Sequence, residues 1–312
     1  MDRLVVNILE SGSIDLSFFD AINLNWFYCA VVVRRNDKII AGLCVYNNAY
    51  IKHDGNSTVL IGNIKCEDNS EVFSLLINET ELIAKKLGAK CIIGPIDGST
   101  WHAYRYSIRE AEGVFSGDIV HDLYYNHLML GNGFSVLHRY YSSVSEIQQW
   151  YDEELLPTGV TIRSINSYKF EDELRALHPM CVSAFADNEL FSPIDEAGFV
   201  KKYIAFEKYL DTDYVQVAED SKGIVALFFC YKGFYKEKPA LIIKTIARHP
   251  ERRYKGLVEM MAKKVFSKAY SEGIMNVVHA FMHEENRSLK LSAEYGGKKI
   301  NEYAVYIKCL HD

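Results

Sequence analysis

One stretch in the last quarter of the chain limits the fold more than any other. An apolar, partly β-branched run at residues 240–250 is followed by a basic turn at residues 251–256 and an amphipathic pattern at residues 257–270. The apolar run predicts a buried strand, and the spacing of apolar residues after the turn predicts a helix. We therefore expect an α/β fold arranged around this strand, turn and helix.

The turn also has the properties of an anion site. Backbone N–H groups at the start of a helix, together with the helix dipole, favour a bound anion. Arg252, Arg253 and Lys255 add positive charge, and Gly256 allows the backbone to approach a ligand closely. The segment lacks the G-x-x-x-x-G-K-[ST] motif of nucleotide triphosphatases and the G-x-G-x-x-G motif of dinucleotide folds. The sequence thus predicts a phosphate site of another kind.

The segment Arg253-Tyr-Lys-Gly-Leu-Val258 resembles the pyrophosphate loop of the GNAT acetyltransferase superfamily. That loop has the approximate pattern Arg/Gln-x-x-Gly-x-Gly/Ala and binds acyl-CoA. The last small residue is replaced by Val258, whose side chain narrows the approach to the pyrophosphate while its N–H group stays available. The loop by itself is equally compatible with a solvated basic turn.

The C-terminal remainder continues the resemblance. GNAT proteins tend to have an Asn after the next strand, a short helix that carries a Tyr, and a glycine turn into a last strand. This chain has the same order, with a strand at residues 275–282, Asn286, a short helix, Gly296-Gly297 and a strand at residues 302–308.

The resemblance implies an acyl-CoA site in the second half of the chain. The pantetheine would lie along the strand where two parallel strands splay apart, and the pyrophosphate would lie on the loop. The co-substrate, acetyl-CoA or another acyl-CoA, is therefore assigned to Thr245, Ile246, Ala247, Arg252, Arg253, Lys255, Gly256, Leu257, Val258 and Asn286.

Transfer of an acyl group to an amine needs a group that deprotonates the amine and one that protonates the leaving thiolate. We expect Glu285 to be the base because it lies beside Asn286; the alternatives are Glu219, Glu284 and His279. For the acid, Tyr295 has the more suitable pKa. Ser292 better fits the aligned Tyr position, from which Tyr295 is displaced by two or three residues.

The first half repeats the order of elements in the second. It has a hairpin at residues 27–46, a strand at 58–65, a helix with an Asp68/Glu71 capping box, and a strand at 90–95. A late helix at 123–133 and a Tyr-rich strand at 134–141 close it. The sequence thus predicts two tandem GNAT-like mixed β-sheets flanked by helices, with domains at residues 1–155 and 156–312.

The first copy is expected to be degenerate. Its loop at residues 65–70 has no Arg-x-x-Gly and carries two acids that would repel a phosphate.

A turn-rich segment at residues 94–106 is similar to a Gly-Pro-x-x-x-Ser/Thr-x-Trp segment of some large GNAT-like bacterial proteins. We expect it to be an inter-domain packing loop with Trp101 as its plug.

Composition excludes several other classes. The net charge is −6 and the basic residues are spread along the chain, so no nucleic-acid surface is indicated. Seven scattered cysteines without a Cys-x-x-Cys pair indicate reduced thiols. With no signal peptide and no long apolar run, we expect a cytoplasmic protein without membrane contact. No metal site is predicted, because neither His283-Glu284-Glu285 nor His121-Asp122 has a supporting ligand pair.

The function predicted from these features is acyl-CoA-dependent N-acyl transfer, acetyl transfer in the first instance, to a small-molecule or peptide amine. A non-catalytic acyl-CoA-binding or regulatory protein is the alternative. An aminoacyl-tRNA-dependent transferase, which also pairs two GNAT-like halves, is disfavoured by the basic pyrophosphate loop. The sequence identifies neither the acceptor nor an oligomeric state.

Overall fold

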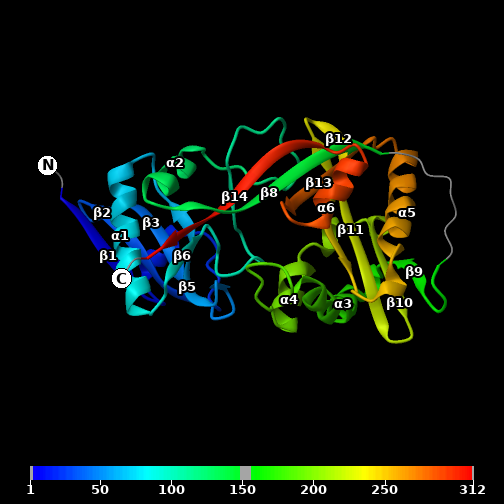
Figure 1. Cartoon of the computed structure of the whole chain (residues 1–312), viewed down its shortest axis with the longest axis horizontal. Coiled ribbons are helices and arrows are strands. Elements are labelled where there is room, and N and C mark those ends of the chain that lie inside the picture. The colour runs from blue at the N-terminus through cyan, green and yellow to red at the C-terminus, as the bar shows by residue number, and fades with distance from the viewer. Residues whose placement is uncertain (1–2, 148–155, 311–312) are drawn as a thin grey trace.

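The computed structural model describes residues 3–147 and 156–310 and shows two α/β halves side by side (Figure 1). The strands are β1 (Leu4–Leu9), β2 (Phe27–Arg35), β3 (Lys38–Tyr46), β4 (Lys52–His53), β5 (Asn56–Lys65), β6 (Cys91–Gly94), β7 (Tyr106–Ser107), β8 (Ser135–Glu146), β9 (Thr161–Ser164), β10 (Val215–Asp220), β11 (Gly223–Tyr235), β12 (Lys238–Arg248), β13 (Asn276–His283) and β14 (Lys298–Cys309). The helices are α1 (Ser70–Lys86), α2 (Tyr124–Gly131), α3 (Phe170–Phe185), α4 (Glu196–Ile204), α5 (Leu257–Ser271) and α6 (Arg287–Glu294). Short 3-10 turns are η1 (Ile14–Phe18), η2 (Ser167–Lys169), η3 (Glu207–Tyr209), η4 (Thr212–Tyr214) and η5 (Arg252–Tyr254).

The two halves exchange their last strands. The sheet runs in the order β1-β2-β3-β5-β6-β14-β8-β13-β12-β11-β10-β9. Strand β14, at the end of the chain, therefore pairs with β6 of the first half, and β8 pairs with β13 of the second half. The two exchanged strands also pair with each other, and both run between the halves in Figure 1. The expected mixed α/β fold is confirmed, and the exchange makes its two half-sheets continuous.

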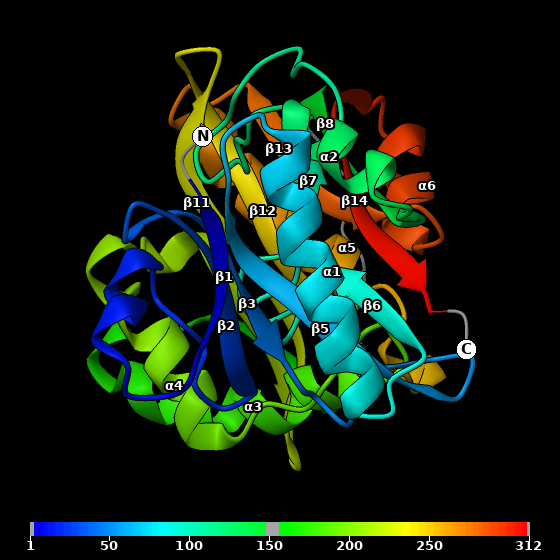
Figure 2. The ribbon, with the colours of Figure 1, turned by 90° about the vertical axis from the view of Figure 1, so that its left-hand side faces the viewer.

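Helices cover the sheet because the strands present apolar side chains on alternate faces. In the first half α1 packs its apolar face on β2 and β3, and Figure 2 shows this helix lying across the strands. In the second half Phe228 packs under α5, while its neighbours Leu227 and Phe229 pack under α3 and α4. Strand β12 likewise contributes Leu241 and Ile243 to the core under α5 and Ala247 to the core under α3 and α4.

Several boundaries differ from those expected. The cap of α1 is Asn69, whose side chain accepts the N–H of Val72, and not Asp68. No sequence pattern indicated strand β1, which pairs with β2 at the edge of the sheet. The predicted domain boundary at 155/156 adjoins residues 148–155, which lie outside the described residues, and it stays a prediction. Within the described ranges, no helix is long and apolar enough to cross a membrane.

Candidate functional site

The parallel strands β12 and β13 separate halfway along their length. They pair only between Ala240–Ile243 and Asn276–His279. Beyond this point β12 has a bulge at Lys244, and β13 has an irregularity at Phe281, whose φ is 57°. Strand β12 stays paired with β11 on its other side. Alternate backbone N–H and C=O groups after Ile243 therefore face a gap instead of a neighbouring strand.

Helix α5 begins beside this gap. Gly256 precedes it with a φ of 94°, a left-handed conformation that glycine adopts without steric cost. No side chain caps the helix, so the N–H groups of its first turn are left for solvent or a ligand. The structure thus has the uncapped helix start that the sequence predicted as an anion site.

A cleft of about 1230 Å³ follows the gap between the strands. Its walls come from β12, β13, the start of α5, α6, the segment from α3 to α4 and the loop at residues 100–105. Most of the predicted site residues line it, namely Thr245, Ile246, Lys255, Gly256, Val258, Glu285, Asn286, Ser292 and Tyr295.

The comparisons with known proteins agree with this geometry. No protein-family model and no curated protein matches the chain. Among solved structures, a GCN5-related N-acetyltransferase from Sphaerobacter thermophilus has a TM-score of 0.52 at 14% identity, over 96% of this chain and 85% of that one. A tandem GNAT protein from the clavulanic acid biosynthesis pathway has a TM-score of 0.51 at 11% identity, over 99% and 100% of the two chains. The chain has a tandem GNAT fold.

Eis1 from Mycobacterium abscessus is similar in the same way, with a TM-score of 0.57 at 7% identity over 98% of this chain and 73% of that one. At such identities the likeness extends to the tandem GNAT fold. What the site does must be argued from its own residues.

Four of the predicted co-substrate residues do not line the cleft. Ala247 and Leu257 have buried side chains, so only their backbone groups are able to face a ligand. Arg252 and Arg253 lie in η5. The guanidinium of Arg253 is 3.1 Å from Asp220 and 2.9 Å from Glu251. Two carboxylates therefore already neutralise the charge that the resemblance assigns to the pyrophosphate.

The two candidates for the catalytic acid differ in access. The Ser292 side chain is buried under Gly297, and its Oγ has no hydrogen-bond partner in the described structure. Tyr295 ends α6 and is partly exposed on the cleft wall. The geometry therefore favours Tyr295, although Ser292 fits the aligned sequence position better.

The candidates for the catalytic base also differ in their position and access to the cleft. Glu285 is exposed on the cleft, and its backbone N–H donates to Nδ1 of His283 at 3.2 Å. Glu219 lies 2.8 Å from Arg163 and does not line the cleft. His279 does line it, but burial lowers its pKa to about 4, so it is a weak base. Its Nε2 lies 3.1 Å from the hydroxyl of Ser145.

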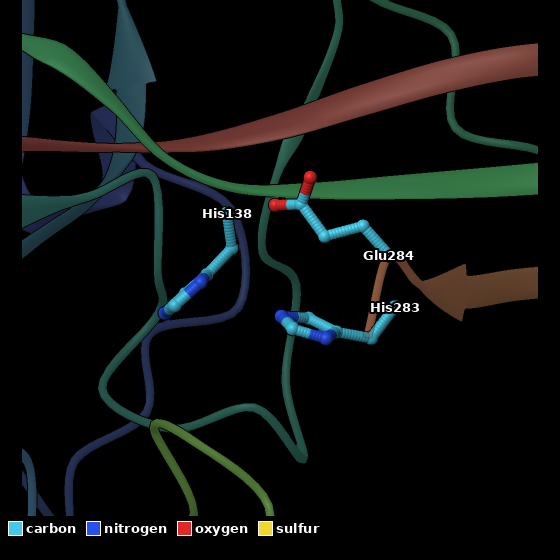
Figure 3. A group of neighbouring side chains, drawn as sticks. All are labelled: His138, His283 and Glu284. Carbon is cyan, nitrogen blue, oxygen red and sulfur yellow. The ribbon is translucent and has the colours of Figure 1, made fainter. Parts of the chain in front are cut away.

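The fold brings a second histidine to His283. His138 on β8, His283 and Glu284 place their ligand atoms within 4.8 Å of one another (Figure 3). This is a set of donors that Zn²⁺ accepts, and sequence spacing gave no sign of it because His138 belongs to the exchanged strand. Protein partners already engage two of the groups: His138 lies 2.5 Å from Glu189, and Glu284 accepts the Arg139 N–H at 2.8 Å.

The Trp101 loop packs as predicted. The indole Nε1 of Trp101 donates to the Ser192 carbonyl at 2.8 Å, and its ring contacts three phenylalanines of the second half, Phe185, Phe191 and Phe199. The same loop also contributes His102, Tyr104 and Arg105 to the cleft wall, a role that the sequence pattern does not indicate.

Proposed function

We propose that the protein is an acyl-CoA-dependent N-acyltransferase that transfers an acyl group, acetyl in the first instance, to a primary amine. The observation that supports this most is the cleft between the separated strands β12 and β13, which ends at the uncapped start of α5. The solved structures with the same tandem fold include proteins named N-acetyltransferases, which agrees with the proposal.

The residues present fit an acyl-CoA. The α5 N-terminus and Lys255 offer N–H groups and a charge to a pyrophosphate. The unpaired edge of β12 at Thr245 offers backbone donors and acceptors to an amide-containing chain such as pantetheine. When bound, acyl-CoA supplies the reactive thioester, and a backbone N–H on this edge is suited to stabilise the carbonyl oxygen as charge develops on it.

Two side chains of the cleft are assigned to the proton transfers. Glu285 is exposed at the end of β13 and takes the proton of the incoming amine. Tyr295 at the end of α6 gives a proton to the departing thiolate. This assignment uses one carboxylate and one phenol, each in its ordinary role as base and acid. The acceptor is a small-molecule or peptide amine.

The cysteines bear on where the protein acts. All seven are free thiols, and six of them are buried. Free buried thiols agree with a reducing compartment, and we propose the cytoplasm as the site of action.

The alternative is a tandem GNAT-fold protein that binds acyl-CoA without turning it over. Three observations favour it: Val258 stands where the resemblance expects a small residue, Ser292 is enclosed, and Tyr295 comes late in the sequence.

Release of free thiol from acetyl-CoA in the presence of a panel of primary amines tests the proposal. We expect release that depends on the amine and falls about 100-fold or more in Glu285→Gln and Tyr295→Phe. Arg175→Gln is a suitable control, because Arg175 pairs with Glu171 and Glu196 on the outside of α3. Binding of acetyl-CoA without amine-dependent release from the whole panel would support the non-catalytic alternative instead.

A further inference from the structure

Arg105 is a buried cation in the cleft wall whose charge has no counterion among the described residues. It is 6% exposed, and its Nε and Nη1 have no hydrogen-bond partner in the described structure. Its guanidinium lies over the rings of Tyr104, Tyr140 and Phe281, with 3.8, 4.5 and 4.5 Å from Cζ to the ring centroids. Its φ of 69° is rare for a residue with a side chain. A buried charge of this kind is costly unless a ligand pairs with it.

Two lysines of the second half join Arg105 on the cleft wall. Lys244 lies on the β12 bulge with its Nζ 5.3 Å from the ring of Phe206, and Lys202 comes from α4. Burial and then Arg105 lower the pKa of Lys244, and burial and then Lys244 lower the pKa of Lys202. Lys244 is therefore close enough to Arg105, and Lys202 close enough to Lys244, for the charges of each pair to repel.

The carboxylates of the cleft wall do not pair with these cations. Glu189, on the same wall, is engaged by His138. Among the ion pairs found in residues 3–147 and 156–310, none involves Arg105, Lys202 or Lys244. Cations from three separate segments thus converge on the cleft without an anion.

This cationic cluster lies away from the start of α5. Strand β12 has α5 packed on one face and α3 and α4 on the other, and the contact of Lys244 with Phe206 belongs to the α4 face. The pyrophosphate assigned to Gly256 and Lys255 therefore leaves the cationic cluster free for another anion.

We propose that Arg105, Lys244 and Lys202 bind the oxyanion of the acyl acceptor, which is then a small amine that carries a carboxylate or a phosphate. The guanidinium fork of an arginine matches either group with two parallel hydrogen bonds, and the aromatic rings hold its plane in one orientation. The identity of the acceptor rests on the proposed acyl transfer; the anion site itself does not.

Binding without any acyl transfer tests the site directly. Glutarate and inorganic phosphate are titrated calorimetrically into the full chain, with the neutral glutaramide as the blank ligand. We expect one of the two anions to bind and Lys244→Gln to weaken that binding about tenfold, because a charged hydrogen bond to the anion is lost. Arg105→Lys keeps the charge but removes the fork, and we expect a similar loss.

Lys201→Gln is the matched control. Lys201 precedes Lys202 on α4 but does not line the cleft, so its replacement is expected to leave anion binding unchanged. Saturating CoA is also expected to leave it unchanged. Equal affinity in wild type and Lys244→Gln, binding of glutaramide as tight as that of glutarate, or displacement of the anion by CoA would each overturn the assignment.

The acceptor class is tested by matched amines in the thiol-release assay. β-Alanine is compared with β-alaninamide, and phosphoethanolamine with ethanolamine. We expect a lower KM for the anionic member of one pair, and loss of that preference in Lys244→Gln. If glutarate or phosphate binds but no amine is acylated, the anion site stands and the proposed acyl transfer fails. If neutral and anionic amines react alike in wild type, the acyl transfer stands and the acceptor assignment fails.

Discussion

Burial without a charged partner determines the state of two histidines beside the cleft. His279 bonds to Ser145, and His102 bonds to Ser99 at 2.9 Å and to Asn23 at 3.2 Å. Burial lowers the pKa of each imidazole to about 4, and Lys202 adds to the effect at His102. Both rings are therefore neutral at pH 7 and act as hydrogen-bonding groups.

Because the fold keeps these two histidines neutral, we expect the protein to lose stability in mild acid. Between about pH 6.5 and pH 4 the unfolded chain binds protons that the folded imidazoles do not, so the free energy of unfolding falls as the pH falls. At pH 5 the buried His279 lowers the free energy of unfolding by on the order of 2 kcal/mol. We therefore expect the free energy of unfolding, measured with urea, to fall less between pH 7 and pH 5 in His279→Gln than in wild type.

A carboxyl group of the first half changes the free energy of unfolding with pH in the opposite sense. Burial raises the pKa of Asp97 to about 6, so folding is favoured as this group becomes protonated. The effect is the same in wild type and in His279→Gln and cancels in the comparison. An identical loss of stability in the two proteins would show that His279 is not held neutral by the fold.

At the scale of single elements, the turn from α6 into β14 determines the position of Ser292. Gly296 has a φ of 75° and open space around its missing Cβ. A Cβ on Gly297 would lie 2.2 Å from Ser292 Oγ and 2.6 Å from its carbonyl oxygen. Gly297 is therefore required because its backbone lies against Ser292, where no side chain fits. Gly296 is required only for its left-handed backbone conformation.

The two glycines make a matched pair of variants. We expect Gly296→Ala to lower the free energy of unfolding by about 1 kcal/mol, the cost of a left-handed residue with a side chain. Gly297→Ala should lower it by about 2–3 kcal/mol, because the backbone of Ser292 must shift. Denaturant unfolding measures both, and a larger effect at Gly296 would contradict the packing described for α6.

At the scale of the whole molecule, the exchanged strands tie the halves together. Strand β14 provides Ala304 and Tyr306 to the core around α1, and it provides Tyr303 and Val305 to the cluster on the other face of the first half. Strand β14 thus completes the hydrophobic core of the first half. Neither half has a complete sheet when the other is removed.

We therefore expect the chain to unfold in one transition. Amide exchange monitored at β3 in the first half and at β11 in the second should report the same free energy of global unfolding. Two separate values would show that the halves fold independently in spite of β8 and β14.

How much the sequence could predict depended on the range of the interactions. Strand β12, the turn and α5 follow from local periodicity and from Gly256, and they were predicted closely. The strand exchange was not predicted, because β8 and β14 have similar sequence patterns. Each of them could pair with β6 or with β13. The environment of Arg105 depends on Tyr140 and Phe281, which only the folded sheet brings to it.

Calorimetric titration with acetyl-CoA shows whether the cleft at the start of α5 binds acyl-CoA. We expect binding to wild type, a loss of about tenfold or more in Lys255→Glu, which reverses a charge on the cleft wall, and a smaller loss in Arg253→Glu, whose charge is held by Asp220 and Glu251. No binding to wild type, or unchanged affinity in Lys255→Glu, would show that acyl-CoA does not bind at the start of α5.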